Sequence, residues 1–272
     1  LPPIPHSAVF GRTLADSNFK AEYAKVAAPA DLMKLGSTLG RMLEAYCTEH
    51  KIPFDGDEGE QFFDELRAEM RAADSVPEAV QRMWTSFQAL RGREFCFILN
   101  QVARNDVPER MGPAATLTRA INQLCVTAGV SGHAADHPPN NMCFRGGGFD
   151  MKYRNFFVAG REFRQPAYLA TSFSKETADA FIERAAESGA ESCVRWIVKI
   201  DPERKCAHVN LVNKRVPGLP DEQEYLFAPY SAFKVTSAAW NAGTVSNPHV
   251  VELLAAPDNK EEPEDLPLAP WS

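Results

Sequence analysis

The sequence has no long apolar run and no excess of positive charge. None of its hydrophobic stretches approaches the roughly 20 residues that a membrane-spanning helix needs, and its first residues lack the charged-then-apolar pattern of a secretory signal peptide. Lys and Arg number 29 against 36 Asp and Glu, giving a net charge of -7, which disfavours nucleic-acid binding by bulk attraction. We expect no membrane span and no nucleic-acid partner.

Closely spaced cysteine pairs are also missing. The six cysteines are scattered, and no two have the Cys-x-x-Cys spacing of a zinc or redox site. Most lie among apolar neighbours, as in Phe95-Cys96-Phe97, where a thiol behaves as a small hydrophobe. We expect free, buried thiols in a reducing compartment, and disulfides in a secreted protein are the alternative.

The histidines offer no better metal site. His133 and His137 could share a metal only on a helix, because their spacing is i, i+4. Gly132 and Pro138-Pro139 disfavour a helix there. No metal is expected.

The first half of the chain is helical by pattern. Its 272 residues are 44% hydrophobic and 24% charged, enough for a sizeable core. Asp31 is a credible N-cap before Leu32, Leu35 and Leu39, which recur at helical spacing. Ser75, with a proline and a glutamate following, opens another helix. The expected helices are about 15–28, 31–50, 58–73, 75–90, 95–104 and 113–126.

The second half is predicted to be rich in strands. They come about every ten residues, with one convincing helix at 174–187. The expected strands are 141–145, 166–172, 193–200, 206–209, 224–227, 232–235 and 249–254. The predicted fold class is α+β: a helical lobe (1–130), a mostly antiparallel β-rich core (131–256) and an acidic, proline-rich tail (257–272) that is disordered or loosely docked.

Three segments of the second half carry candidate chemistry. Phe144-Arg145-Gly146-Gly147-Gly148 combines a forked cation with glycines that let backbone amides approach an anionic ligand. Tyr168 to Ser174 ends a strand in hydroxyl groups. Glu222-Gln223-Glu224 places two carboxylates on one side of an extended backbone. Taken singly, each segment has an ordinary structural alternative. Arg145 would be an ion-pair partner, Thr171 and Ser172 would form a helix-entry turn, and the glutamates would belong to an acidic surface turn.

In this order and spacing the three segments resemble those of the mono-ADP-ribosyltransferases of the Arg–Ser–Glu class, the family of arginine-modifying bacterial toxins and animal ecto-enzymes. The resemblance covers about residues 95–254, including a helix with Leu99-Asn100 and Arg104 before the arginine strand. It implies an ADP-ribosyltransferase-like core with an NAD cleft, and NAD as co-substrate.

The resemblance also implies which residues bind NAD. Arg145 would contact the phosphates, and Gly146 would present backbone groups to the nicotinamide amide. Thr171 and Ser172 match the second and third positions of the family's Ser-Thr-Ser strand. Ala170 replaces the first serine, which in the family commonly bonds the catalytic glutamate, so the orientation of that glutamate is left open.

The two glutamates would be the catalytic residues. By the resemblance, Glu224 would hydrogen-bond the nicotinamide ribose and stabilise the oxocarbenium-like transition state. Glu222 would position and help deprotonate the acceptor, and a glutamate there goes with arginine as target. The loop at 213–221 would recognise that target. A carboxylate beside a carbon that gains positive charge is the arrangement that glycoside hydrolysis also needs.

Aromatic side chains divide into two groups. Tyr153, Phe156 or Phe157, in the loop after Arg145, are candidates to cover the nicotinamide. A second group is expected in the core: Tyr225, Phe227, Tyr230 and Phe233.

The predicted function is transfer of ADP-ribose from NAD to a protein side chain, arginine first, with release of nicotinamide. An NAD glycohydrolase with water as acceptor and a catalytically weak module that binds NAD or a partner are the alternatives. The expected site of action is the cytosol, for a resident protein or for one delivered there as a secreted effector. The acceptor protein stays unidentified.

Overall fold

The computed structural model describes residues 13–126, 138–204, 206, 208–210 and 222–270. These residues form two compact units. One is helical and consists of residues 16–125, and the other, rich in strands, contains the remaining described residues.

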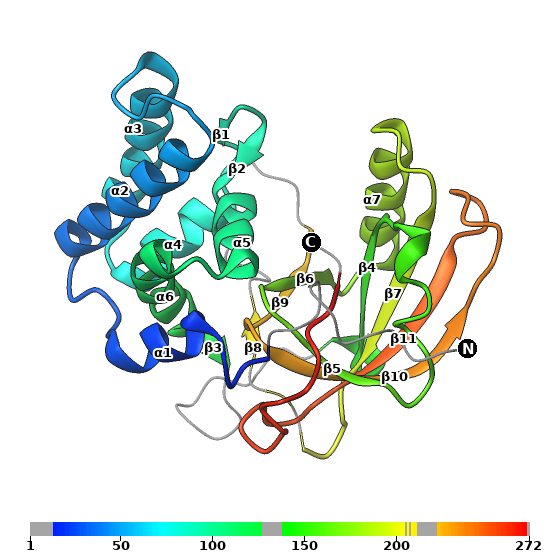
Figure 1. Ribbon diagram of the computed structural model, residues 1–272. Coiled ribbons are helices and arrows are strands. Elements are labelled where there is room, and N and C mark those ends of the chain that lie inside the picture. Colours follow the sequence, from blue (N-terminus) through cyan, green and yellow to red (C-terminus); the bar gives the residue numbers. More distant parts are fainter. Residues whose placement is uncertain (1–12, 127–137, 205, 207, 211–221, 271–272) are drawn as a thin grey trace. The chain divides into compact units, whose positions relative to one another are not determined.

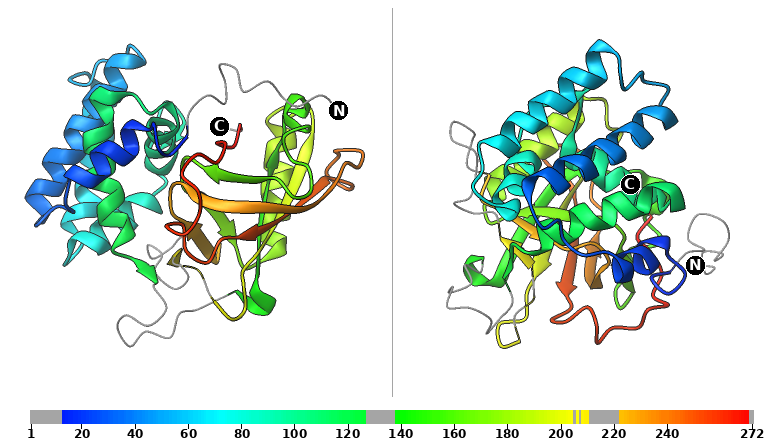
Figure 2. Two further views of the ribbon diagram at one scale, coloured as in Figure 1. Left: turned by 60° about the horizontal axis from the view of Figure 1, so that its bottom comes forward. Right: turned by 90° about the vertical axis from the view of Figure 1, so that its left-hand side faces the viewer.

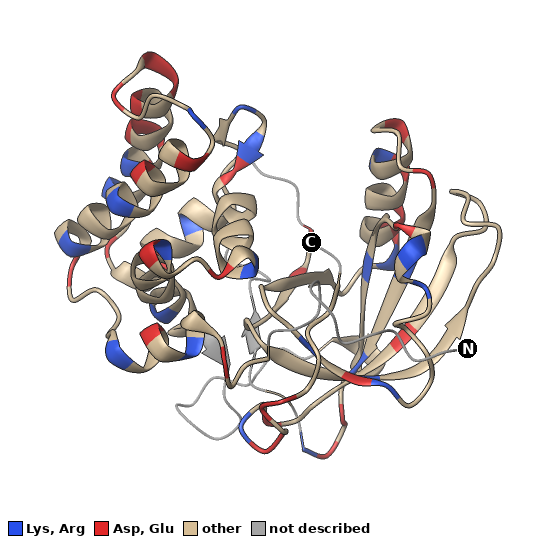
Figure 3. Cartoon of the chain, in the orientation of Figure 1, with Lys and Arg blue, Asp and Glu red and all other residues tan. Residues whose placement is uncertain are grey.

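The helical unit follows the periodic pattern of its sequence. The predicted caps are confirmed, because the side chains of Asp31 and Ser75 accept backbone hydrogen bonds at the starts of their helices. Acidic residues fill the first turn of α3, at the positive end of its dipole (Figure 3). The helices are α1 (Asn18–Lys25), α2 (Leu32–Glu49), α3 (Asp57–Arg71), α4 (Val76–Trp84), α5 (Phe95–Asn105) and α6 (Pro108–Asn122).

Two helices differ from the prediction by several residues. The helix expected to reach residue 90 ends at Trp84, and a hairpin of β1 (Ala89–Leu90) and β2 (Arg93–Glu94) follows. Arg91 and Gly92 both have positive φ, 50° and 74°, which suits a two-residue hairpin turn.

The last helix of this unit starts earlier than expected. It begins at Pro108 rather than at Gly112-Pro113, and Pro113 lies inside it. Met111 and Leu117 are fully buried on either side of this proline. Their burial outweighs the loss of one helix hydrogen bond.

The strand-rich unit is built on one sheet, with the order β3-β8-β9-β6-β4-β7-β11-β10-β5 among the described residues. β7 and β11 pair in parallel, and the pairs β4–β6, β4–β7, β6–β9, β8–β9, β10–β11 and β5–β10 are antiparallel. The strands are β3 (Cys125–Val126), β4 (Met142–Gly148), β5 (Glu162–Gln165), β6 (Leu169–Ser172), β7 (Cys193–Lys199), β8 (His208–Asn210), β9 (Glu224–Phe227), β10 (Ser231–Ala239) and β11 (His249–Ala255). Helix α7 (Lys175–Glu187) lies along β4 and β7 (Figure 1, Figure 2). The α+β fold class is confirmed.

The core of this unit is aromatic. Tyr225, Phe227, Tyr230 and Phe233 are buried, as predicted. Phe156 and Phe157 are buried as well, with 2% and 0% exposure, and pack edge to face on Phe163. The expectation that either ring covers the nicotinamide is therefore wrong, because both rings are used in the core.

The acidic tail is docked rather than disordered. Arg164 of β5 is 1% exposed, and its guanidinium donates to the carbonyl oxygens of Tyr230, Asn259, Glu262 and Pro263 at 2.7–3.1 Å. Its backbone also bonds Pro267 and Ala269. The sequence analysis left a disordered and a loosely docked tail as alternatives, because composition records the tail's charge but not the buried arginine that binds its main chain.

Replacing Arg164 by Lys is expected to lower the free energy of unfolding by about 2 kcal/mol, because an ammonium cannot reproduce the forked donors to buried carbonyl oxygens. Urea unfolding measures the loss, and proteolysis at the acidic tail should become faster. Arg204→Lys is the matched control, since Arg204 also contacts the tail, at Glu261, through an exposed ion pair. An equal shift in both variants would contradict the role of Arg164.

At the start of β11, His249 is buried, with 3% exposure, against the rings of Phe149 and Trp240. Burial lowers the pKa of His249, and the nearby Arg154 lowers it further. The unfolded chain therefore binds a proton more readily at this position than the folded chain does.

We expect the protein to lose stability as pH falls below the ordinary histidine pKa of about 6.5, because protonation favours the unfolded state there. Urea midpoints measured from pH 7.5 to pH 5.5 test this. His249→Phe keeps an aromatic ring and should flatten that part of the curve. An unchanged slope in the variant would assign the acid sensitivity to other groups.

Candidate functional site

Strands β4, β6 and β9 lie side by side in the sheet and carry the residues that the sequence singled out. Phe144 pairs with Ser172, and Ser172 pairs with Glu224. Adjacent strands are about 4.8 Å apart, so these three residues form one line across the sheet. Residues 28 to 80 positions apart in the chain thus meet at one place.

The guanidinium of Arg145 lies beside β6. Arg145 is an exposed residue of β4, and its Nη1 donates a hydrogen bond to the carbonyl oxygen of Ala170 at 2.9 Å. In Figure 1, β6 runs across the direction of β4, and the register joins these two strands at the Phe144–Ser172 pair. The forked cation of Arg145 is therefore held next to Ala170.

Gly146 has a packing role that the sequence did not reveal. It is buried, and a Cβ there would lie 1.8 Å from the carbonyl oxygen of Ala178 and 2.8 Å from Cγ1 of Ile182, both on α7. At Gly147 a Cβ would meet nothing within 4 Å. The glycine at 146 is needed because α7 touches the strand there.

The hydroxyl groups of β6 bond the segment that carries the glutamates. Thr171 Oγ1 donates to the carbonyl oxygen of Tyr225 at 2.6 Å, and Ser172 Oγ donates to that of Glu222 at 2.5 Å. Both residues are buried. They fix β9 and the turn before it to β6.

The two glutamates belong to that turn and to the start of β9. Glu222 and Glu224 are half-buried, and Gln223 between them is exposed with a φ of 47°. This left-handed residue interrupts the extended backbone that the sequence analysis assumed. The carbonyl oxygen of Gln223 also accepts from the backbone amide of Phe173, at 3.0 Å.

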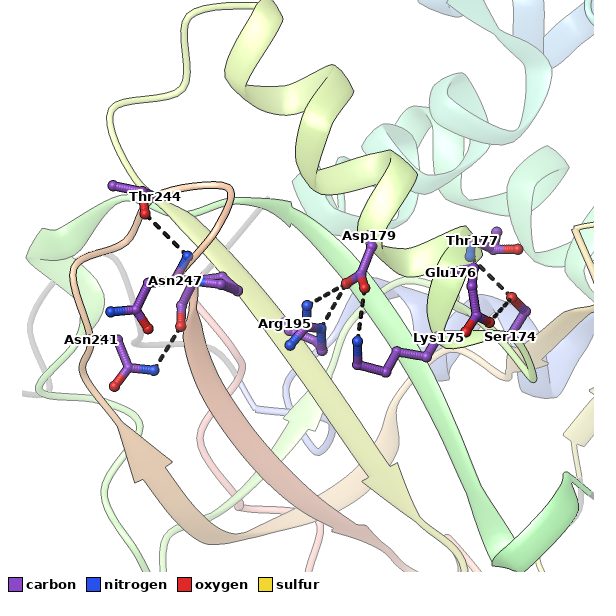
Figure 4. Close-up of polar contacts among 10 residues, drawn as sticks. Ser174, Lys175, Glu176, Thr177, Asp179, Arg195, Asn241, Thr244 and Asn247 are labelled. Carbon is purple, nitrogen blue, oxygen red and sulfur yellow. Dashed lines mark hydrogen bonds and ion pairs between the residues drawn. The ribbon is translucent and has the colours of Figure 1, made fainter.

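Helix α7 begins directly after the hydroxyl-bearing strand. Ser174 caps it by accepting from the amide of Thr177 at 3.1 Å, and the amide of Ser174 donates to Ser172 Oγ at 2.9 Å. One turn later, Asp179 accepts from Nε and Nη2 of Arg195 on β7 and pairs with Lys175 (Figure 4). Burial alone would raise the pKa of Asp179, but hydrogen bonds from Lys175 and Arg195 outweigh it and keep this pKa below its usual value.

Sequence reasoning missed this ion pair. Asp179 and Arg195 are 16 residues apart and belong to different elements. The available signal was a charged residue inside the otherwise apolar strand 193–198. Strand register places Arg195 opposite Gly146, under α7.

Some predicted features lie outside the described residues: His133, His137 and the whole loop at 213–221. Within the described residues, no cluster of three or more His, Cys, Asp or Glu side chains is arranged to hold a metal. No helix in that part of the chain is long and apolar enough to cross a bilayer. Cys47, Cys143 and Cys193 are buried free thiols, and burial raises the pKa of Cys143 to about 12.

A groove of about 510 Å³ lies in the helical unit, between α2 and α3. Its lining includes Met33, Phe63 and Arg67, and none of the residues predicted for NAD. It is a feature separate from the β4–β6–β9 site.

No protein-family model matches the chain, and neither does any curated protein. Among solved structures, it is similar to the ADP-ribosyltransferase Vis in complex with agmatine (15% identity, 76% of this chain and 88% of that chain, TM-score 0.48). HopU1, an ADP-ribosyltransferase of Pseudomonas syringae pv. tomato DC3000, gives 16% identity over 75% of this chain and 84% of that chain, with a TM-score of 0.43. The catalytic domain of VahC from Aeromonas hydrophila gives 12% identity over 68% of this chain and 100% of that chain, with a TM-score of 0.42. These TM-scores are below 0.5, and the fold described above rests on the strand order and register alone.

Proposed function

We propose that the protein transfers ADP-ribose from NAD to a protein side chain and releases nicotinamide. The observation that carries the proposal is the register of β4, β6 and β9, which aligns Phe144, Ser172 and Glu224 and sets Arg145 against Ala170. The strands that carry Arg145 and Glu224 are about two strand spacings apart, and a forked cation and a carboxylate on them suit a dinucleotide whose phosphates are anionic and whose ribose gains positive charge.

In this proposal Arg145 binds the phosphates of NAD, while Thr171 and Ser172 shape the nicotinamide end of the site and Gly146 lets α7 approach β4. Glu224 faces the ribose and stabilises positive charge at its anomeric carbon as the bond to nicotinamide breaks. A fixed carboxylate is effective because it needs no reorganisation during the reaction.

Glu222 acts on the acceptor. A carboxylate near the same carbon can accept a proton as the acceptor nitrogen attacks, which suits an arginine guanidinium. The agmatine named with one of the similar structures is a small guanidine, and it serves here as a test acceptor. Ala170 provides no hydroxyl to Glu224, so we assign the placement of this strand to Thr171 and Ser172.

The deciding experiment measures nicotinamide release from NAD with and without agmatine, together with labelling of a cell lysate by tagged NAD. Transfer predicts faster release with agmatine and labelled protein bands. A rate of nicotinamide release that agmatine does not change, together with no labelled protein, would favour the NAD glycohydrolase. Calorimetric binding of NAD without release would favour the binding module.

A further inference from the structure

A chain of contacts leads from the Asp179–Arg195 ion pair to the glutamates. Arg195 is 17% and Asp179 34% exposed, so the pair is partly shielded from water. Nε of Arg195 donates to Oδ1 of Asp179 at 2.8 Å, and Nη2 reaches the same oxygen. The pair thus joins α7 to β7 with a forked donor.

The pair lies beside the contact between α7 and Gly146. Asp179 follows Ala178, whose carbonyl oxygen occupies the space above Gly146. Arg195 pairs in register with Gly146 itself. Contact with the glycine restricts the distance of α7 from the sheet, and the ion pair restricts its sliding along β7.

The start of α7 transmits this placement to β9. The amide of Ser174 donates to Ser172 Oγ, which donates to the carbonyl oxygen of Glu222. The amide of Phe173 donates to Gln223 in parallel. A shift of α7 would therefore move the backbone on both sides of Gln223.

We propose that the Asp179–Arg195 pair is a positioning element for Glu222 and Glu224: it fixes α7 against β7, and through Ser174 and Ser172 it holds the segment that carries both glutamates. This inference rests on the proposed function. The phosphates of NAD are assigned to Arg145, whose hydrogen bond to Ala170 does not involve α7. Loss of the Asp179–Arg195 pair should therefore affect the chemical step more than NAD binding.

The test measures kcat and KM for nicotinamide release in Asp179→Asn. We expect kcat to fall about tenfold, because small misplacements of catalytic groups are costly, while KM for NAD changes less than about twofold. Lys175→Met removes the second cation that pairs with Asp179, an exposed lysine. The kcat of this control variant should stay within about twofold of the wild-type value.

Two further variants separate positioning from general stability. The kcat of the double variant Asp179→Asn, Ser172→Ala should lie within about twofold of the kcat of Ser172→Ala alone, because both changes act on one chain of contacts. Exchanging the charges, with Asp179→Arg and Arg195→Asp, should recover most of the lost kcat, and it provides the test if Asp179→Asn does not fold. Unchanged kcat in Asp179→Asn, a change in KM alone, or multiplicative effects with Ser172→Ala would overturn the proposal.

Amide hydrogen exchange distinguishes this failure from failure of the proposed function. Asp179→Asn should speed exchange at the amides of Phe173 and Ser174, whether or not NAD is cleaved. A wild type that releases no nicotinamide, with faster exchange in the variant, would reject the function and keep the mechanical link. Unchanged exchange would reject the link.

Discussion

Glu224→Gln is expected to lower kcat for nicotinamide release by about 10²–10³-fold, the usual cost of removing one preorganised electrostatic group from a transition state. The amide keeps the size of the side chain and removes its charge. Binding of NAD should change little, because the phosphates of NAD are assigned to Arg145. Steady-state release of nicotinamide and calorimetric titration with NAD measure the two quantities separately.

Two controls sharpen this prediction. Glu191→Gln removes an exposed carboxylate from the loop before β7 and should leave kcat unchanged. Glu222→Gln should reduce transfer to agmatine and retain nicotinamide release, because its assigned partner is the acceptor. Release by Glu224→Gln at the wild-type rate would remove the carboxylate from the mechanism and end the proposed assignment.

Gly146→Ala is expected to cost about 3 kcal/mol or more of folding stability, at or above the upper end for overpacking, because its Cβ would overlap a backbone atom. The overlapping atom is the carbonyl oxygen of Ala178, 1.8 Å from the Cβ position, so no side-chain rotation relieves it. Either α7 moves away from β4 or the unit unfolds. Urea unfolding gives the loss of stability.

Gly147→Ala is the matched control one residue away. Its Cβ would enter open space, and its φ is not in the left-handed region. The same glycine-to-alanine change should therefore cause no loss and can add about 0.4–1 kcal/mol by restricting the unfolded chain. Equal destabilisation of both variants would show that the cost comes from the strand backbone and not from α7.

Local features of the structure were predictable where neighbouring residues determine them. The side chains of Asp31 and Ser75 accept hydrogen bonds from backbone amides three residues later in the chain, so each cap is a local feature. Along β7, buried residues alternate with half-buried ones from Val194 onward, and the sequence shows that period in the charged Arg195 and Lys199 on the half-buried face. The sequence could not decide between a disordered and a docked tail, because the tail's docking depends on Arg164, about 100 residues earlier.

By itself the sequence determined a helical first half, a strand-rich second half and three segments whose residue types suit an anionic nucleotide. Only the tertiary structure decided that these segments are neighbours, since the order β9-β6-β4 is set by long-range strand pairing. It also decided that Gly146 supports α7 and that Asp179 reaches Arg195. Both roles depend on the distance between α7 and the sheet, and a linear pattern of residues does not encode that distance.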